Sequence, residues 1–494
     1  MPTYEPVIGL EIHIQLNTQT KIFCACKADS WGAPPNTNIC PVCCGLPGVL
    51  PVLNRAVVEK AALLAAALNC KLRAESFFDR KNYFYPDLPK GYQITQYDAA
   101  LGHDGYFDVP LPDGTLKRVT IRKLHIEEDA GKTKNDAARG VRLIDMNRCG
   151  VPLVEMVTGP DLRSADEAAQ FLLRLRQLLR WLDVSEANME RGHLRCDANV
   201  SIREAGAAHL NPKTEIKNIN SIEALRHAIQ AEVERQIGEM RAGRRVVAWT
   251  LDWDDETQTL RKMRSKETEA DYRYFREPDL LSAQLTPEQQ AEILRRLPEL
   301  PLERRARFIR DYGLPEYDAG VLTDERALSD YFEQTVQSLA QQSAADGRPS
   351  IKNPPKLVAN WLMNDILRLL NERGLTVGEL ARTLTPERLA ELIQLVEDKT
   401  INRATGVSLL PRILEGGQSP RALVEAEGLA QISGDEAIRA FARAVIAENP
   451  EQVAAYRKKP TLLKWFVGQV MRKSQGKANA QAAERILSEL LNEP

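Results

Sequence analysis

Residues 10–16 read LEIHIQL, and the strict alternation of apolar and polar side chains in this stretch predicts a β-strand with one buried face. The apolar side chains would pack into a core, while Glu11, His13 and Gln15 would project from the opposite face. A single histidine on a strand is more often a hydrogen-bonded residue than a ligand. Because Glu11 shares its face, we nevertheless treat His13 as a candidate for the functional site.

Three further segments repeat this arrangement, at residues 123–129, 194–203 and 214–220. Their charged side chains include Glu127, Glu128, Arg195, Asp197, Glu215 and Lys217. The alternation also places Ile219 on the face of Glu215 and Lys217. Each segment alone is most simply interpreted as an antiparallel strand with one solvated face. Together they favour an oxygen-rich site that holds Mg²⁺ while cations bind phosphate oxygens, as phosphoryl transfer requires.

The chain is expected to contain two or three domains, because 494 residues are too many for one ordinary core. Up to about residue 290, short alternating segments mix with turns and a few helical stretches, which is typical of an α+β domain with an antiparallel sheet. From Thr286 onward helical spacing prevails, and prolines stand at plausible helix starts. These are Pro301, Pro315, Pro354, Pro386, Pro420 and Pro460. The C-terminal part is therefore predicted to be all helix.

The composition is that of a folded soluble protein, with 43% hydrophobic and 27% charged residues. A formal net charge of −2 gives no overall attraction to nucleic acid, so any RNA contact has to be local. The first residues contain no apolar run long enough for a signal sequence or a membrane span, which predicts residence in the cytosol. In that reducing compartment the eight cysteines are expected to be thiols or metal ligands.

Four of the cysteines form two tight pairs separated by a loop rich in Gly, Pro and Asn. The pairs are Cys24 with Cys26 and Cys40 with Cys43. Tetrahedral Zn²⁺ needs four converging thiolates, which paired cysteines on tight turns supply. The alternative interpretation is a group of buried, unpaired thiols. We predict a zinc knuckle with a structural role, because four thiolates leave no coordination position open for a substrate.

Two other stretches are rich in cations. Residues 79–87, DRKNYFYPD, combine Lys81 with Tyr83 and further aromatics, which suits base stacking and phosphate binding but is about equally common at the edge of an aromatic core. A basic run near the C-terminus is by default a solvated helix face, with an RNA-backbone contact as the alternative. Its members are Lys458, Lys459, Lys464, Arg472, Lys473 and Lys477.

Several longer motifs together resemble those of the GatB family, the B-type subunits of the bacterial aspartyl/glutamyl-tRNA amidotransferases. The motifs are residues 9–13, the cysteine pairs with residues 35–37, and residues 46–54, 79–87 and 150–155. The resemblance extends over essentially the whole chain. It implies a catalytic domain of glutamine-synthetase-like α+β fold at residues 1–292, a helical connector at residues 293–408, and a helical tail at residues 409–494 that contacts tRNA through the basic run.

The resemblance also implies a reaction. ATP and Mg²⁺ would convert the side-chain carboxylate of mischarged Glu-tRNA(Gln) or Asp-tRNA(Asn) into an acyl phosphate, from which ammonia would form the amide. Activation is required because oxide is a poor leaving group. The implied Mg²⁺ ligands are Glu11, His13, Glu127 and Glu128, and the implied lining of the catalytic site adds Asp197 and Glu215. The implied substrate-binding residues are Lys81, Tyr83, Arg195 and Lys217.

The source of ammonia is expected to lie in another chain, because this sequence has no amidase-type segment rich in Gly and Ser. An amidase-type glutaminase subunit would deliver ammonia, and a small third subunit would complete a heterotrimer. The sequence departs from the family pattern at Cys44, Cys149, Gly159 and Arg276, none of which belongs to the predicted metal site. Two other hypotheses stay open. One is a non-catalytic, zinc-containing tRNA-binding protein, and the other is an amide ligase for free glutamate or aspartate.

Overall fold

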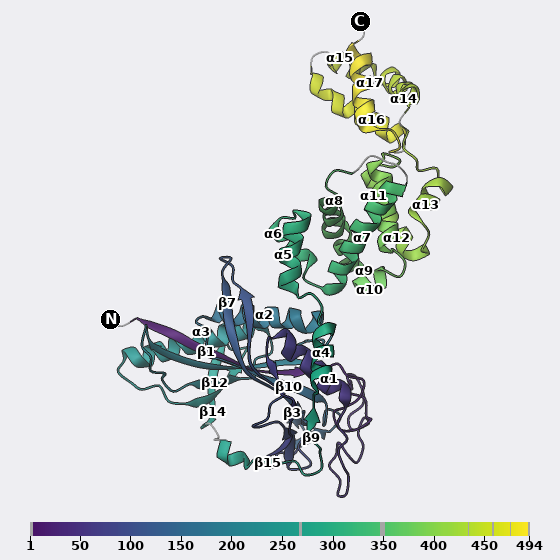
Figure 1. The fold of residues 1–494 in the computed structure, drawn as a ribbon. Helices are drawn as coiled ribbons and strands as arrows, with labels where there is room; N and C mark the ends of the chain where they lie inside the picture. The colour runs from purple at the N-terminus through teal and green to yellow at the C-terminus, as the bar shows by residue number, and fades with distance from the viewer. Residues whose placement is uncertain are drawn as a thin grey trace. The chain divides into compact units, whose positions relative to one another are not determined.

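The computed structural model describes residues 3–265, 269–345, 351–432, 434–456, 459–474 and 476–492. The chain divides into two compact units, Met1–Pro301 and Leu302–Pro494. The first unit is mixed α+β and the second is helical (Figure 1). Both predictions of fold class are thus confirmed at this level. Among the described residues, no helix has the length and apolar character needed to cross a membrane.

A nine-stranded sheet forms the centre of the first unit. In spatial order its strands are β14 (Thr259–Ser265), β13 (Trp249–Asp254), β12 (Thr214–Lys217), β11 (Leu194–Glu204), β1 (Tyr4–Gln15), β10 (Pro152–Thr158), β7 (Leu116–Glu128), β6 (Gly102–Pro110) and β2 (Lys71–Leu72). Neighbouring strands are antiparallel except for the parallel pair β12 and β13. The N-terminal strand β1 is therefore central, between two partners that come much later in the chain.

Three smaller sheets complete the strands described in this unit. They are β15 (Phe275–Arg276) with β4 (Asp79–Asn82) and β5 (Tyr92–Thr95), β16 (Ala283–Gln284) with β3 (Glu75–Ser76), and β8 (Lys132–Asp136) with β9 (Val141–Asp145). A 3-10 helix at Glu269–Tyr272 precedes β15. The helices are α1 (Arg55–Ala67), α2 (Ala165–Trp181), α3 (Ile222–Arg241) and α4 (Pro287–Arg296).

Helices cover one face of the large sheet. Helices α2 and α3 lie side by side (Figure 1), and each begins at a serine whose hydroxyl accepts a backbone N–H of the first turn. Their apolar side chains and those of α1 form one core with the inward side chains of the strands, among them Leu10, Ile12, Ala198 and Val200. Because the helices occupy the apolar face, the polar face of the same strands is left for the functional site.

The predicted alternation is confirmed in β1 and β11. Leu10, Ile12 and Ile14 are buried while Glu11 and His13 are partly exposed, and β11 alternates in the same way. The prediction for Ile219 is wrong. Strand β12 ends at Lys217 because Asn218 adopts a positive φ of 65°, and Ile219 turns into the hydrophobic core.

Helices make up most of the described residues from Pro301 onward. They are α5 (Pro301–Tyr312), α6 (Glu316–Leu322), α7 (Arg326–Ala345), α8 (Pro354–Trp361), α9 (Leu367–Arg373), α10 (Val377–Leu380), α11 (Pro386–Glu397), α12 (Arg403–Gly416), α13 (Pro420–Ala426), α14 (Asp435–Glu448), α15 (Pro450–Tyr456), α16 (Leu463–Lys473) and α17 (Ala480–Asn492). A π-helical turn at Leu362–Ile366 joins α8 to α9, and a 3-10 turn at Pro460–Leu462 precedes α16. As predicted, prolines 301, 354, 386 and 420 are the first residues of helices.

Two hydrophobic cores stabilise this helical unit. The first contains buried residues from Phe308 to Val424, and the second contains buried residues from Ile438 to Leu491. The division into a connector and a tail stays a prediction. Its proposed boundary after residue 408 falls inside α12, and the boundary after residue 292 falls inside α4.

Candidate active site

Strand pairing gathers the predicted polar residues on one face of the large sheet. On β1, Glu11 lies opposite Asp197 of β11, and His13 lies opposite Arg195. On the other side of β1, His13 lies opposite Glu155 of β10. Residues directly opposite one another in antiparallel strands share a face of the sheet. Side chains from three strands therefore converge at this point.

Histidines and buried glutamates form the centre of the site. Nε2 of His13 lies 3.4 Å from Oε1 of Glu127 and 3.6 Å from Oε2 of Glu155. Nε2 of His125 lies 3.1 Å from the same Glu155 oxygen. Ligand atoms of Glu11, His13 and Glu155 lie within 4.8 Å of one another, and so do those of His125, Glu127 and Glu155. Carboxylate oxygens and imidazole nitrogens at this spacing can share a divalent cation.

A second acidic group adjoins the first through Glu11. Ligand atoms of Glu11, Asp197 and Glu215 lie within 4.8 Å of one another. Nζ of Lys217 lies 2.6 Å from Oδ2 of Asp197 and 3.6 Å from Oε1 of Glu215. In this part of the site, the ammonium group of Lys217 therefore balances part of the negative charge.

Three other cations approach the same face. Nη2 of Arg195 donates to Oδ2 of Asp129 at 2.9 Å, while its buried Nε has no hydrogen-bond partner among the described residues. Arg148 Nε lies 3.4 Å from the same Asp129 oxygen. Nζ of Lys81 lies 4.8 Å from the centre of the Tyr272 ring, which permits a cation–π contact. The site therefore has donors suited to anionic oxygens beside the acidic centre.

Burial and neighbouring charges set the protonation of these groups. Burial raises the pKa of Glu11, and the nearby Glu155 raises it further. Burial also opposes the charge of Glu155, but His125 and His13 hold its pKa below the usual range. For Lys81, burial opposes the charge, yet Glu127 raises the pKa above its usual value. The site therefore holds an ionised Glu155 and a cationic Lys81 beside a Glu11 whose negative charge needs a further cation.

These side chains line a cavity of about 520 Å³. The predicted residues that line it are Glu11, His13, Lys81, Tyr83, Glu127, Arg195, Glu215 and Lys217. Asp197 contacts the lining through Lys217. Two tyrosines from the segment after β14, Tyr272 and Tyr274, complete the lining, and the rings of Tyr274 and Tyr97 stack with their centres 4.1 Å apart. A cavity of this size that is lined by both carboxylates and cations can hold a phosphorylated small molecule.

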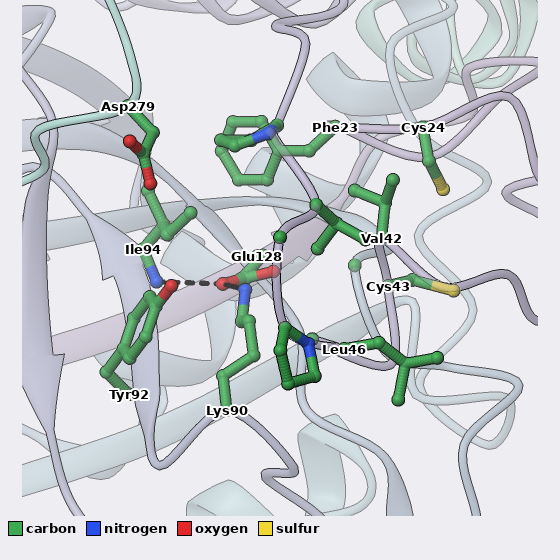
Figure 2. Close-up of a pocket in the computed structure, with 16 residues that line it drawn as sticks. Phe23, Cys24, Val42, Cys43, Leu46, Lys90, Tyr92, Ile94, Glu128 and Asp279 are labelled. Carbon is green, nitrogen blue, oxygen red and sulfur yellow. Dashed lines mark hydrogen bonds and ion pairs between the residues drawn. The ribbon is translucent and has the colours of Figure 1, made fainter.

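Glu128 does not join this group. Successive residues of a strand point to opposite faces, so Glu128 projects away from the face of Glu127. Figure 2 shows it beside Lys90 and Ile94, in a second cavity that Cys24 and Cys43 also line. The volume of this cavity is about 250 Å³. Its carboxylate pairs with Lys90 and accepts the backbone N–H of Ile94 at 2.9 Å. The structure thus separates Glu128 from the other predicted Mg²⁺ ligands.

Glu155, at the centre of the site, was not predicted from the sequence, and neither was Arg148 in the lining. Glu155 lies in the otherwise apolar stretch VPLVEMV of residues 151–157, and its side chain is almost fully buried. A single carboxylate within a buried strand is costly unless it is paired. A single carboxylate in an apolar strand was therefore the feature of the sequence that could have indicated Glu155. Its partner, His125, is identified only by the pairing of β10 with β7.

The four predicted zinc ligands come together in the first unit. The Sγ atoms of Cys24, Cys26, Cys40 and Cys43 all lie within 4.8 Å of one another. Tetrahedral thiolates at about 2.3 Å from zinc are roughly 3.8 Å apart, so the arrangement fits that ion. Cys44, the next residue along the chain, is not part of the cluster found among the described residues.

The predicted tRNA-contacting cations lie in the last part of the helical unit. Lys464, Arg472 and Lys473 belong to α16, and Lys473 pairs with Glu448 of α14. Lys459 is exposed and Lys477 is partly buried. Lys458 lies outside the described residues. The tRNA contact itself stays a prediction.

Comparison with known proteins matches both units. Residues 6–291 match the family model of the GatB/GatE catalytic domain, and residues 330–491 match that of the GatB domain. The B-type subunit of the aspartyl/glutamyl-tRNA(Asn/Gln) amidotransferase from Thermosynechococcus vestitus is 49% identical over 99% of this chain and 97% of its own length. The subunits of the same name from Thermodesulfovibrio yellowstonii and Thermotoga maritima are 45% and 44% identical, each over 99% of this chain and 100% and 99% of their own lengths. The chain therefore belongs to the GatB family of aspartyl/glutamyl-tRNA(Asn/Gln) amidotransferase subunits.

Proposed function

We propose that this chain is the subunit of a tRNA-dependent amidotransferase that activates and amidates the side chain of Glu-tRNA(Gln) or Asp-tRNA(Asn). Its relatives are named for the aspartyl/glutamyl-tRNA(Asn/Gln) amidotransferase. One observation carries the proposal at the level of residues. A single cavity is lined by Glu11, His13 and Glu127 together with Lys81 and Arg195. An acidic centre beside cationic donors is what transfer of a phosphoryl group to a carboxylate requires.

The reaction would proceed in two displacements. An oxygen of the substrate carboxylate attacks the γ-phosphorus of ATP, and ADP leaves with the electrons of the broken P–O bond. Ammonia then attacks the acyl carbon, inorganic phosphate leaves, and the amide nitrogen loses a proton. The first displacement is needed because oxide is too poor a leaving group for attack by ammonia, whereas phosphate is a good one.

The acidic centre would hold Mg²⁺ through Glu11, His13, Glu127 and Glu155. Glu155 takes the place that sequence reasoning gave to Glu128, because it lies 3.6 Å from His13 while Glu128 faces the second cavity. When bound, Mg²⁺ would neutralise charge on the transferring phosphate oxygens. The raised pKa of Glu11 supports a cation here, since a divalent ion would make its ionised form favourable.

The cations that line the cavity would hold the substrate. Arg195 has a buried Nε that lacks a partner among the described residues, and it can donate to an anionic oxygen. Lys81 keeps its charge beside Glu127 and Tyr272. Tyr83 and Lys217 also line the cavity, and Asp197 and Glu215 orient Lys217 through ion pairs of 2.6 and 3.6 Å. These residues would orient the carboxylate and keep water from the acyl phosphate.

The finer features of the fold belong to the same proposal. The first unit would be a catalytic domain of glutamine-synthetase-like fold, since its antiparallel-dominated sheet has one helix-covered face and one polar face. The cysteine cluster would bind Zn²⁺ in a structural role, because all four ligands are thiols. The helical unit would comprise a connector and a tail that contacts tRNA through its exposed cations. The enzyme would work in the cytoplasm, where these cysteines stay reduced.

Ammonia would come from an amidase-type glutaminase subunit, and a small third subunit would complete the complex. The word "subunit" in the names of the relatives supports a multi-chain assembly.

The experiment is ATP turnover by the purified complex with mischarged tRNA. We expect hydrolysis that depends on mischarged tRNA, and its loss in Glu11→Gln while tRNA binding is retained. Glu5→Gln is the matched control, because Glu5 lies on the same strand but pairs with Arg203 at the edge of the unit, outside the cavity. Turnover that is unchanged in Glu11→Gln would refute the catalytic role and favour a tRNA-binding protein. Turnover with free glutamate or aspartate would favour a small-molecule ligase.

A further inference from the structure

Lys21 is the one lysine that is fully buried among the described residues, with 0% of its side chain exposed. It follows β1 and precedes the first cysteine pair. Its backbone N–H donates to the carbonyl of Cys26, so it belongs to the cysteine loop itself. Nothing in the proposed reaction uses this residue.

The ammonium group of Lys21 has an incomplete set of partners. Nζ donates to the backbone carbonyl of Asn38 at 2.9 Å and lies 3.7 Å from Sγ of Cys43. No carboxylate of the residues that the structure describes forms an ion pair with it. A buried charge is unfavourable unless an opposite charge compensates it. The side chain that its ammonium group contacts is Cys43, a member of the cysteine cluster.

A loaded cysteine cluster would supply that opposite charge. Four thiolates around a divalent ion carry a net charge of −2, and one ammonium group reduces this to −1. An N–H donor beside a ligand sulfur also disperses the charge of that sulfur. The negative charge of a loaded cluster would therefore compensate the buried ammonium group of Lys21, and Lys21 would in turn reduce the net charge of the cluster.

We propose that Lys21 is a positioning residue for the cysteine-bound metal, and that it stabilises the loaded cluster through its contact with Sγ of Cys43. The inference rests on the proposed zinc site and adds a residue outside the four ligands. Lys21 slows the release of the metal, and it makes the Cys43 thiolate a poorer nucleophile toward oxidants and alkylating reagents.

A purely structural role is the competing explanation. In that case the hydrogen bond to Asn38 holds the loop, and the charge of Lys21 is incidental. The two roles differ once the metal is removed. A hydrogen bond that only holds the loop stabilises the protein equally with zinc bound and with zinc removed. A charge that interacts with the cluster stabilises only the zinc-bound protein.

The test compares Lys21→Met with Lys27→Met in the full-length chain purified with its partner subunits. Both changes remove one positive charge from the cysteine loop, but Lys27 is exposed. We expect Lys21→Met to transfer zinc to a chromogenic chelator about 10 to 100 times faster than the wild type, the range typical of groups that support metal ligands. Lys27→Met should release zinc at the wild-type rate, and Lys21→Arg should recover most of the loss. In the Co²⁺-substituted protein, the thiolate charge-transfer bands should shift in Lys21→Met only.

Each outcome decides a different point. Wild-type protein that contains no zinc after metal-controlled purification refutes the zinc site itself. Wild-type protein with zinc, together with an unchanged release rate in Lys21→Met, refutes the role of Lys21 alone. If Lys21→Met lowers the melting temperature equally with and without chelator, Lys21 only holds the loop, and its proposed role at the metal is refuted. If Lys21→Met and Lys21→Gln do not fold while Lys21→Arg folds with zinc, the charge requirement is supported. Failure of all three overturns the proposal.

Discussion

The adjacent residues Glu127 and Glu128 offer a matched pair for testing the proposed Mg²⁺ site. Both lie on β7 and both are almost fully buried, with 2% and 3% exposure. They face opposite sides of the sheet, toward the two different cavities. Replacing each in turn with Gln changes one charge at nearly constant volume and burial, so the two variants differ chiefly in which cavity loses it.

The expected effects differ in kind. Two unit charges about 4 Å apart interact by roughly 4 kcal/mol at an effective dielectric constant of 20. A Gln oxygen can still coordinate, so we expect Glu127→Gln to weaken Mg²⁺ binding by about 3 kcal/mol, or roughly 100-fold. Glu128→Gln leaves Lys90 buried without its partner, which costs about 3 to 5 kcal/mol of folding stability, but Mg²⁺ binding should change less than about threefold.

The assay is the Mg²⁺ dependence of ATP turnover by the complex at a fixed low temperature at which both variants stay folded. Urea unfolding of the same preparations gives the stability change. An equal shift of the half-saturating Mg²⁺ concentration in both variants, or a larger shift in Glu128→Gln, would refute the proposed division between the two cavities. Loss of stability without a shift in Glu127→Gln would likewise remove Glu127 from the metal site.

Three further predictions concern stability. Burial opposes ionisation of Glu155, but the histidines hold its pKa below the ordinary value of 4.5, so its contribution is present above about pH 4.5 and is lost as pH falls toward the folded-state pKa. Glu155→Gln should therefore be about 2 kcal/mol less stable than the wild type at pH 7, and urea titrations should show this difference shrinking in acid. Chelation of zinc should lower the melting temperature of the first unit and leave the transition of the helical unit in place, and calorimetry showing no change in the first transition would contradict the structural role. Gly45 has a φ of 66°, and a Cβ there would lie 2.1 Å from Cγ of Lys90, whereas Gly48 has a φ of 85° and open space. Gly45→Ala should cost about 1 kcal/mol more than Gly48→Ala in urea unfolding, because only Gly45 adds a clash to the backbone strain.

Much of the site follows from the period of a β-strand. Alternation alone placed Glu11 with His13, Arg195 with Asp197, and Glu215 with Lys217, and the structure keeps each pair on one face. The tight spacing of the cysteines likewise indicated their cluster, since paired thiols two or three residues apart cannot lie far from each other. These are local properties, which depend on backbone geometry over a few residues.

The tertiary structure decided which of these faces meet. Strand β1 pairs with β10 on one side and β11 on the other, and only this order brings Glu155 to His13 and leaves Glu128 to the second cavity. Alternation along residues 123–128 puts Glu128 on the face of Leu124 and Ile126, and Glu127 on the face of His125, but it does not show which other strands border each face. Those neighbours depend on register and pairing between segments far apart in the chain, which the local pattern of one strand does not contain. The sequence alone thus determined the kinds of residue in the site, and the fold determined its members.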